Sequence, residues 1–201
     1  MNQQKILIIS DIDGTIRDIY TDMAKCYNKK YNKNISIADF YKEIVCVVHP
    51  DNVRIIMEVV DELGPSLYEN APADYYVLGI YRLMLKMFKG DIDIIFITTY
   101  ISDEIMEATY KWVDHHIHKK IPIIFNKLGH IRKEVPQEYM NYDKYLIVDD
   151  IEKIAKNLAE DLLKAGKEAA YAAVKYGEDP NVNVEIIRKA ASELLGCPRK
   201  T

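Results

Sequence analysis

The chain has 201 residues, of which 49% are hydrophobic and 29% charged, the composition of a folded domain and not of a disordered chain. Its 27 basic and 31 acidic residues give a net charge of −4, which argues against a surface for polymeric nucleic acid. No stretch reaches the roughly 18–20 apolar residues of a membrane span. Three widely spaced cysteines fit no metal pattern and suggest reduced thiols, so we expect a cytoplasmic protein without a membrane partner.

The first predicted element is a strand at residues 6–9 (ILII), a short β-branched run that ends in the polar segment 10–15. The following segment, 16–90, contains no clear strand and is predicted to be a helical insertion. Gly64-Pro65 ends its third helix. The four predicted helices span residues 22–31, 37–48, 51–63 and 74–88.

Three further apolar runs, at 92–97, 121–125 and 145–148, predict strands. Helical segments separate them, among them an amphipathic stretch from 102 to 118 that begins with a capping serine and two acids. Strands that alternate with helices predict a parallel sheet covered on both faces.

The C-terminal part of the sequence gives conflicting signals. After an amphipathic helix at 152–164, residues 168–176 (EAAYAAVKY) have a helix-forming composition, but their position in the alternation predicts a fifth strand. We favour the strand. A final helix is predicted at 184–195.

Polar signatures end three of the predicted strands at the carboxyl edge, where open parallel sheets place their ligands. We therefore expect the carboxylates of Asp11, Asp13 and Asp149 to converge. Clustered carboxylates raise one another's pKa unless a cation lies among them, and oxygen ligands without His or Cys favour Mg²⁺. The signatures are DIDGT at 11–15, Thr98-Thr99 and Asp149-Asp150.

The two-residue spacing of Asp11 and Asp13 indicates a division of roles. Beyond a strand end, alternation directs both side chains toward one pocket, where one can act as nucleophile and the other as proton donor. Gly14 permits the tight turn, and Thr15 holds it by side-chain hydrogen bonding.

This ordered set of motifs resembles the haloacid dehalogenase (HAD) superfamily of phosphohydrolases over nearly the whole chain. ILIISDIDGT matches the first motif of that family, IIFIT the second and YLIVDD the fourth. The resemblance implies an α/β fold with a three-layer, Rossmann-like parallel sheet. Residues 1–15 and 91–201 would form this core, and residues 16–90 would form a helical C1 cap inserted after the first strand.

The resemblance also implies a hydrolase that acts on phosphoric monoesters with Mg²⁺ as cofactor. Asp11 would attack phosphorus to give an aspartyl-phosphate, and Asp13 would be the acid/base. Thr98, with Thr99 beside it, would bind the phosphoryl oxygens. The implied metal site consists of Asp11, the backbone carbonyl of Asp13, Asp149 and, ordering the ligands behind them, Asp150.

Two lysines compete for the third motif of the family, a single lysine that neutralises the phosphate and the nucleophile. Lys127 closely follows the strand at 121–125, whereas Lys133 lies farther into the loop but nearer to the fourth motif. We favour Lys127 as the catalytic and phosphate-binding lysine, because strand ends are rigid positions for a catalytic charge.

Within the superfamily, the cap length and the aromatic stretches at 68–81 and 108–117 most resemble the 5′(3′)-deoxyribonucleotidase branch. That resemblance implies a small phosphorylated substrate, a (deoxy)nucleoside monophosphate, whose base is held between cap aromatics. Phe40 and Tyr41 are the candidates, although such residues more often form the core of the cap.

Several alternatives stay open. The chain could be a sugar-phosphate phosphatase or phosphomutase of the same superfamily, or a catalytically idle domain that binds phosphate or a partner. An insertion as long as 16–90 is expected to close over the site and select the substrate. It could instead stabilise the core or mediate a homodimer.

Overall fold

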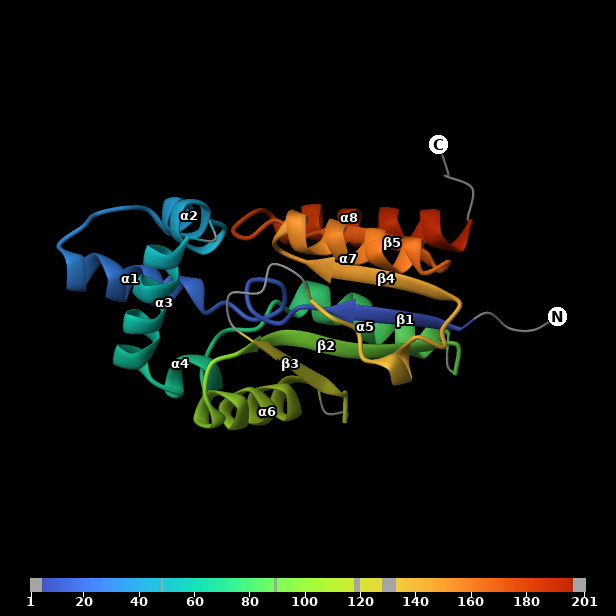
Figure 1. Cartoon of the computed structure of the whole chain (residues 1–201), viewed down its shortest axis with the longest axis horizontal. Coiled ribbons are helices and arrows are strands. Elements are labelled where there is room, and N and C mark those ends of the chain that lie inside the picture. The colour runs from blue at the N-terminus through green and yellow to red at the C-terminus, as the bar shows by residue number, and fades with distance from the viewer. Residues whose placement is uncertain (1–4, 48, 89, 118–119, 128–132, 197–201) are drawn as a thin grey trace.

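One parallel sheet organises the protein. The computed structural model describes residues 5–47, 49–88, 90–117, 120–127 and 133–196. Within these ranges the strands lie in the order β3-β2-β1-β4-β5, and each neighbouring pair is parallel. The arrowheads of the strands point toward a group of helices at one end of the molecule (Figure 1). The predicted parallel α/β sheet is therefore confirmed. The strands are β1 (Ile6–Ser10), β2 (Ile92–Tyr100), β3 (Ile123–Lys127), β4 (Lys144–Asp149) and β5 (Glu168–Ala173).

The strands follow the apolar runs of the sequence with two informative differences. β3 begins at Ile123, directly after Pro122, whose missing N–H makes it a poor ladder residue. β5 is a strand at the edge of the sheet despite its helix-forming alanines, so topology prevails over propensity there. Helices α7 and α8 both pack closely on this alanine-rich strand, because small side chains allow that approach.

Helices connect the strands and form the end of the molecule. The predicted helices are present, with bounds that differ by a few residues, and a short helix at Ser66–Glu69 was not predicted. The helices are α1 (Tyr20–Tyr31), α2 (Ile37–Phe40), which continues as a π-helical turn (Tyr41–Val45), α3 (Pro50–Leu63), α4 (Ser66–Glu69), α5 (Tyr75–Met87), α6 (Asp103–Ile117), α7 (Glu152–Lys164) and α8 (Pro180–Leu195).

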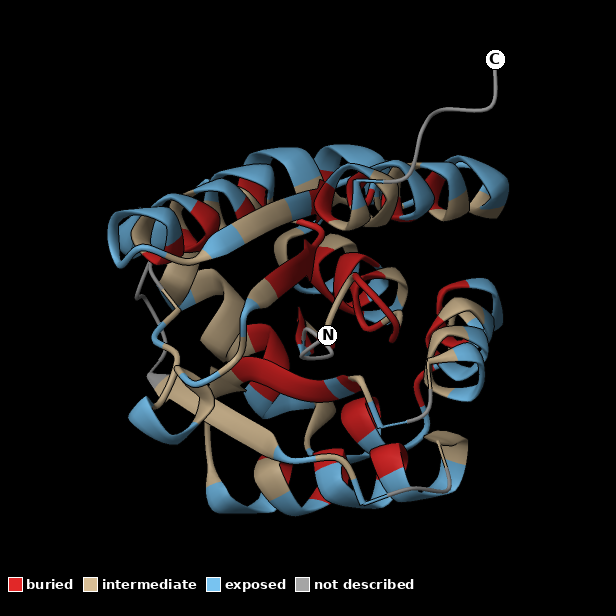
Figure 2. Ribbon diagram, turned by 90° about the vertical axis from the view of Figure 1, so that its right-hand side faces the viewer, coloured by how far each residue is buried: buried red, intermediate tan, exposed pale blue. Residues whose placement is uncertain are grey.

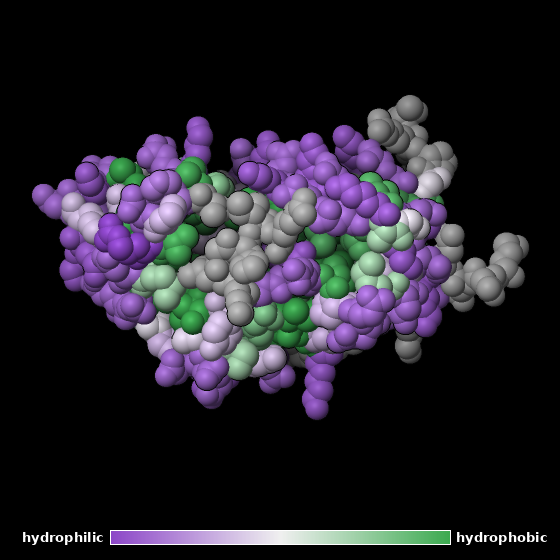
Figure 3. Space-filling model, in the orientation of Figure 1, coloured by the Kyte–Doolittle hydropathy of each residue, from purple (hydrophilic) through white to green (hydrophobic). Residues whose placement is uncertain are grey.

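The sheet is the middle of three layers. Ile6 and Ile8 of β1 pack on one side with residues of α5, α6 and α8, whereas Leu7 and Ile9 pack on the other side with α7. In Figure 2 the central strands are largely buried and the surrounding helices turn exposed faces outward. Figure 3 shows hydrophilic side chains along the upper and lower margins of one face and hydrophobic ones gathered along its middle, over the sheet. None of the helices in the described ranges combines the length and hydropathy needed to cross a bilayer.

A second hydrophobic cluster forms what we call the helical lobe, residues 19–71. It joins α1, α2, α3 and α4 and also contacts the first turns of α6. α5, which lies within the predicted insertion 16–90, packs instead with the sheet through Val77, Leu78 and Tyr81. By its packing, α5 thus belongs with the sheet, whereas the earlier helices of the predicted insertion form the lobe.

Two short segments, 16–18 and 72–74, connect the lobe to the sheet, and they run side by side. The Asp18 N–H donates to the Pro72 carbonyl at 2.9 Å, and the Asp74 N–H donates to the Ile16 carbonyl at 2.8 Å. Arg17 and Ala73 form an antiparallel bridge between them. We refer to 16–18 and 72–74 as the connecting segments.

Substitution of Phe40 tests whether its ring is part of the core of the helical lobe. Its ring is 0% exposed and lies 5.4 Å from the Tyr27 ring, so Phe40→Ala should lower the free energy of unfolding by about 3–5 kcal/mol, measured by chemical denaturation. Ile37→Ala, in the same short helix but 37% exposed, is the matched control and should cost less than about 1 kcal/mol. Equal, small losses in both variants would contradict a core role for Phe40.

Candidate active site

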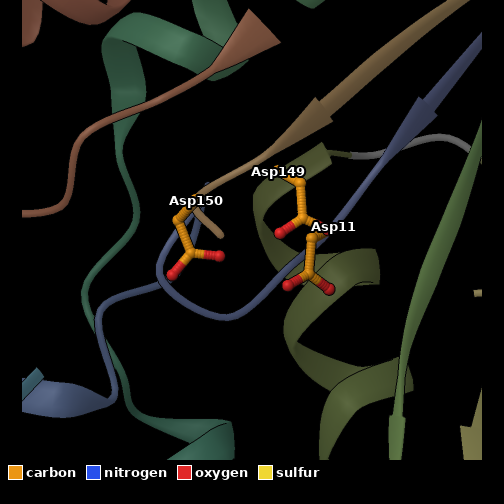
Figure 4. Close-up of side chains that lie close together, drawn as sticks. All are labelled: Asp11, Asp149 and Asp150. Atoms are coloured by element: carbon orange, nitrogen blue, oxygen red, sulfur yellow. The ribbon is translucent and has the colours of Figure 1, made fainter. Parts of the chain in front are cut away.

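The carboxyl ends of β1 and β4 bring three carboxylates together. Asp11 follows β1, and its N–H donates to the Val148 carbonyl of β4 at 2.8 Å, which aligns the two strand ends. Asp149 ends β4 and Asp150 follows it. One oxygen from each of Asp11, Asp149 and Asp150 lies within 4.8 Å of the others (Figure 4). The predicted convergence of Asp11 and Asp149 is present in the structure.

Lys133 lies between two of these carboxylates. Its Nζ is 2.9 Å from Asp11 Oδ1 and 2.6 Å from Asp149 Oδ2, and its side chain is only 9% exposed. Burial alone would lower the pKa of Lys133, but the carboxylates of Asp11 and Asp149 outweigh burial and raise the pKa above its usual value. Lys133 is thus held as a cation that partly compensates the clustered negative charge.

The positive charge of Lys133 does not fully compensate the clustered carboxylates, because the pKa values of Asp11 and Asp150 are still raised. Burial raises the pKa of Asp11 to about 7, with contributions from Asp149 and Asp13, although Lys133 opposes the shift. Burial and the neighbouring Asp149 and Asp11 likewise raise the pKa of Asp150. The site therefore favours the binding of additional positive charge.

The donor atoms suit a hard divalent cation. All three side chains offer carboxylate oxygens, which are the ligands that Mg²⁺ prefers. Asp150 Oδ2 is buried and has no hydrogen-bond partner within the described part of the chain, and such an orphaned oxygen is suited to a cation. Asp11, Asp149 and Asp150 therefore fit Mg²⁺. The carboxylate of Asp13 is not part of this cluster, and its backbone oxygen accepts a hydrogen bond from the Tyr20 hydroxyl at 3.4 Å.

Asp13 points toward a different set of partners. Its Oδ1 accepts a hydrogen bond from Arg17 Nε at 2.7 Å, and Thr98 Oγ1 at the end of β2 donates to its Oδ2 at 3.4 Å. Thr98 is 1% exposed. Thr99 is half-buried, and strand alternation places it on the opposite face of β2. Of the two predicted threonines, Thr98 is therefore the one that contacts Asp13, the candidate acid/base.

The loop after Asp13 can approach Asp150 only because residue 14 is glycine. Gly14 has φ +79°, and a Cβ built on it would lie 2.1 Å from Asp150 Oδ2 and 2.6 Å from the Tyr20 ring. Thr15 Oγ1 donates to Asp150 Oδ1 at 3.4 Å, so the threonine reaches across to the carboxylate cluster. Gly14 and Thr15 therefore hold the first and fourth motifs together.

One of the two candidate lysines, Lys133, contacts the acids within the described part of the chain. The backbone of Lys127 ends β3 opposite Tyr100, and its side chain lies outside the described residues. The rigidity of strand ends favours Lys127. In the structure, the loop residue Lys133 reaches Asp11 and is held there by the carboxylates of Asp11 and Asp149.

The two predicted cap aromatics have different surroundings. Phe40 is wholly buried in the helical lobe, so its ring has no face open to a ligand. Tyr41 extends from the π-helical turn, and its hydroxyl donates to the Asp150 carbonyl at 2.9 Å. Its ring packs at 5.3 Å from Tyr20 and 5.0 Å from Tyr176. The helical lobe thus contacts the core directly beside the carboxylates.

Sequence reasoning missed three residues of this site, namely Arg17, Tyr20 and Tyr176. Arg17 lies four residues after Asp13 in the sequence, a spacing that by itself does not distinguish a surface charge from a buried partner. The two tyrosines belong to a set of 15, and that number hides them. The Tyr20 hydroxyl donates to the Asp13 carbonyl, and the Tyr176 ring packs on Tyr41.

Comparisons with known proteins bear on the fold. No protein-family model and no curated protein matches this sequence. A solved hydrolase from Streptococcus pneumoniae TIGR4 aligns over 93% of this chain and 99% of its own, with a TM-score of 0.54 and 14% sequence identity. A hydrolase from Pseudomonas syringae aligns over 92% of this chain and 98% of its own, with a TM-score of 0.46 and 12% identity.

A third solved structure is the putative HAD-hydrolase YfnB from Bacillus subtilis, bound to magnesium. It aligns over 93% of this chain and 100% of its own, with a TM-score of 0.48 and 15% identity. At such identities the likeness concerns the fold, and of these three structures the Streptococcus protein has the TM-score that supports it. The predicted α/β, Rossmann-like architecture is therefore confirmed.

The raised pKa of Asp11 predicts how pH affects stability without a metal. The pKa rises from 3.8 to about 7 on folding, so the native state binds more protons in this window and loses stability as pH increases across it. Asp11→Asn removes this effect. We expect the free energy of unfolding of Asp11→Asn, relative to wild type, to increase from pH 4 to pH 7 in chelator, measured by chemical denaturation.

Saturating Mg²⁺ should reduce this difference, because a ligand that binds the native state stabilises the wild type. A relative stability that stays constant with pH, or that decreases, would mean that burial of Asp11 does not control its ionisation.

Proposed function

We propose that this protein is a Mg²⁺-dependent phosphomonoesterase of the HAD superfamily that works through an aspartyl-phosphate. The observation that carries the proposal is the contact of Lys133 with both Asp11 and Asp149 at the carboxyl edge of the sheet. A cation between a candidate nucleophile and a candidate metal ligand is suited to hold the phosphoryl group that reacts. The ordered HAD-like motifs and the similar fold agree with the proposal.

In the proposed reaction an oxygen of Asp11 attacks phosphorus, and the bond from phosphorus to the ester oxygen breaks. Asp13 gives a proton to the leaving oxygen. Asp13 then takes a proton from water, whose oxygen attacks phosphorus, and the bond to Asp11 breaks to release phosphate. Thr98 would donate to the phosphoryl oxygens, and Lys133 would neutralise part of their charge.

Asp11, Asp149 and Asp150 are the residues that would hold Mg²⁺, with the Asp13 carbonyl nearby. When bound, the metal supplies charge neutralisation at the phosphoryl group. The role of this chain's residues is to keep these oxygens together and to limit water. The buried position of Asp149 and Asp150, and the contact of Tyr41 with the Asp150 backbone, serve that role.

We propose nucleoside monophosphates as the first substrate class to test. The support is the resemblance of the motifs and aromatic stretches to the deoxyribonucleotidase branch, together with the tyrosine cluster beside the carboxylates. Tyr41 is the remaining candidate of the two cap aromatics. Sugar phosphates form the comparison class.

The first experiment is a hydrolysis screen over nucleotides and sugar phosphates with Mg²⁺ and with chelator. Wild type should release phosphate only with the metal. Asp11→Asn should lose several orders of magnitude of turnover, because positioning cannot replace a nucleophile. If Asp11→Asn keeps more than about a tenth of wild-type turnover, the covalent mechanism is wrong for this chain. An inactive wild type on all esters would support the idle-domain alternative.

A second experiment decides between the two lysines. Lys133→Met should lower kcat by about 10²–10³-fold, since it removes a cation positioned on the reacting group. Lys127→Met is the comparison variant and should change kcat by less than about threefold, because Lys133 already supplies the cation beside Asp11. The reverse order of severity would restore Lys127 as the motif-three lysine.

A further inference from the structure

Arg17 is a charged side chain that lies almost entirely inside the protein. It belongs to the connecting segment 16–18 and is 1% exposed. Its Nε donates to Asp13 Oδ1 at 2.7 Å, and Asp13 itself is 15% exposed. A buried guanidinium without a partner would be very costly, so Asp13 and Arg17 depend on each other for their positions.

The rest of the guanidinium is fixed from the far side. Nη1 donates to the Tyr68 carbonyl at 3.3 Å, and both Nη1 and Nη2 lie 3.2 Å from Thr109 Oγ1. The rings of Tyr68 and Trp112 lie 5.0 Å and 5.3 Å from its central carbon. These contacts fix both the position and the plane of the guanidinium, as a planar fork with stacked rings allows.

The partners of Arg17 come from both parts of the molecule. Tyr68 belongs to α4 in the helical lobe, whereas Thr109 and Trp112 belong to α6 beside the sheet. A purely structural arginine could join these parts through any buried acceptor. Here the carboxylate that completes its hydrogen bonds is Asp13, the candidate acid/base, whose other oxygen faces Thr98 at the proposed phosphoryl site.

We propose that Arg17 is a positioning residue for Asp13. By holding Oδ1, it directs Oδ2 toward the oxygen that leaves phosphorus. This inference rests on the proposed function and assigns a role to a residue outside the family-like motifs. In the step concerned, the proton on Oδ2 moves to the ester oxygen as its bond to phosphorus breaks.

Leaving groups of different quality separate positioning from a structural role. A proton from Asp13 matters greatly when an alkoxide leaves and little when a stable aryloxide leaves. The first step with a simple alkyl phosphate, in which the alcohol departs, should therefore depend on Arg17, whereas the first step with p-nitrophenyl phosphate should not.

The test uses the full chain with Mg²⁺ and measures kcat/KM for both esters. This parameter reports the steps up to departure of the alcohol and leaves out the later attack of water, in which Asp13 acts as the base for both esters alike. Arg17→Lys keeps the charge but lacks the fork that fixes Oδ1. It should lower kcat/KM for the alkyl phosphate by about 10²-fold and for p-nitrophenyl phosphate by less than about fivefold. Asp13→Asn should show the same selectivity, and the double variant should lose no more than Asp13→Asn alone.

A second variant covers the case in which Arg17→Lys fails to fold, as judged by circular dichroism. Thr109→Val removes the acceptor behind the guanidinium without touching Asp13, and it should show a smaller loss with the same selectivity. Thr109→Ser, which keeps the hydroxyl, should restore the alkyl phosphate rate.

The outcomes separate this inference from the proposed function. Equal losses of kcat/KM on both esters in these variants would overturn the positioning role, while wild-type turnover would still support the phosphatase activity. A folded wild type that hydrolyses neither ester with Mg²⁺ would overturn both.

Discussion

The mutual repulsion of three acidic side chains in a confined space is the constraint on which the rest of this structure depends. Asp11, Asp149 and Asp150 lie within a few ångströms of one another at the edge of the sheet, where burial raises the pKa of Asp11 and Asp150. Such an arrangement persists only because the surrounding fold determines it. The aligned ends of β1 and β4 fix the backbones, and Lys133 supplies one internal cation. The remaining negative charge makes the site suited to a further cation.

Much of the fold and part of the site could be predicted from the sequence because they depend on local signals. Continuous apolar runs indicate strands buried on both faces, and acids that directly follow such strands must lie at one edge. This reasoning placed Asp11 and Asp149 correctly in space. The alternation of strands and helices also predicts β5 as a strand, because the segment that follows α7 returns to the sheet and pairs with β4 in parallel. Where a residue is fixed by its position relative to a strand end, sequence alone is informative.

The remaining features depend on contacts between distant segments. Lys133 reaches Asp11 from a loop whose path no local pattern specifies, so proximity to a strand favoured Lys127. The sequence does not distinguish Arg17 from a surface charge, yet the rings of Tyr68 and Trp112, from two separate helices, pack against its guanidinium. Phe40 and the next residue, Tyr41, are equally aromatic, but one lies in the lobe core and the other reaches Asp150. α5 has an apolar face that fits either core, and only its packing assigns it to the sheet. Partner choice of this kind is set by tertiary structure.

The side-by-side course of the connecting segments has a consequence for how the lobe can vary. Because Arg17 and Ala73 are bridged, the chain enters and leaves the lobe at a single point. For the folding of the sheet, the lobe is therefore equivalent to a closed loop. The entropy of closing a loop grows only slowly, by about 0.6 kcal/mol for each doubling of its length. Insertions and deletions among the lobe helices would thus be nearly neutral for assembly of the sheet. The lobe, which contacts the Asp150 backbone through Tyr41, is therefore free to vary in length while the arrangement of the three carboxylates is kept.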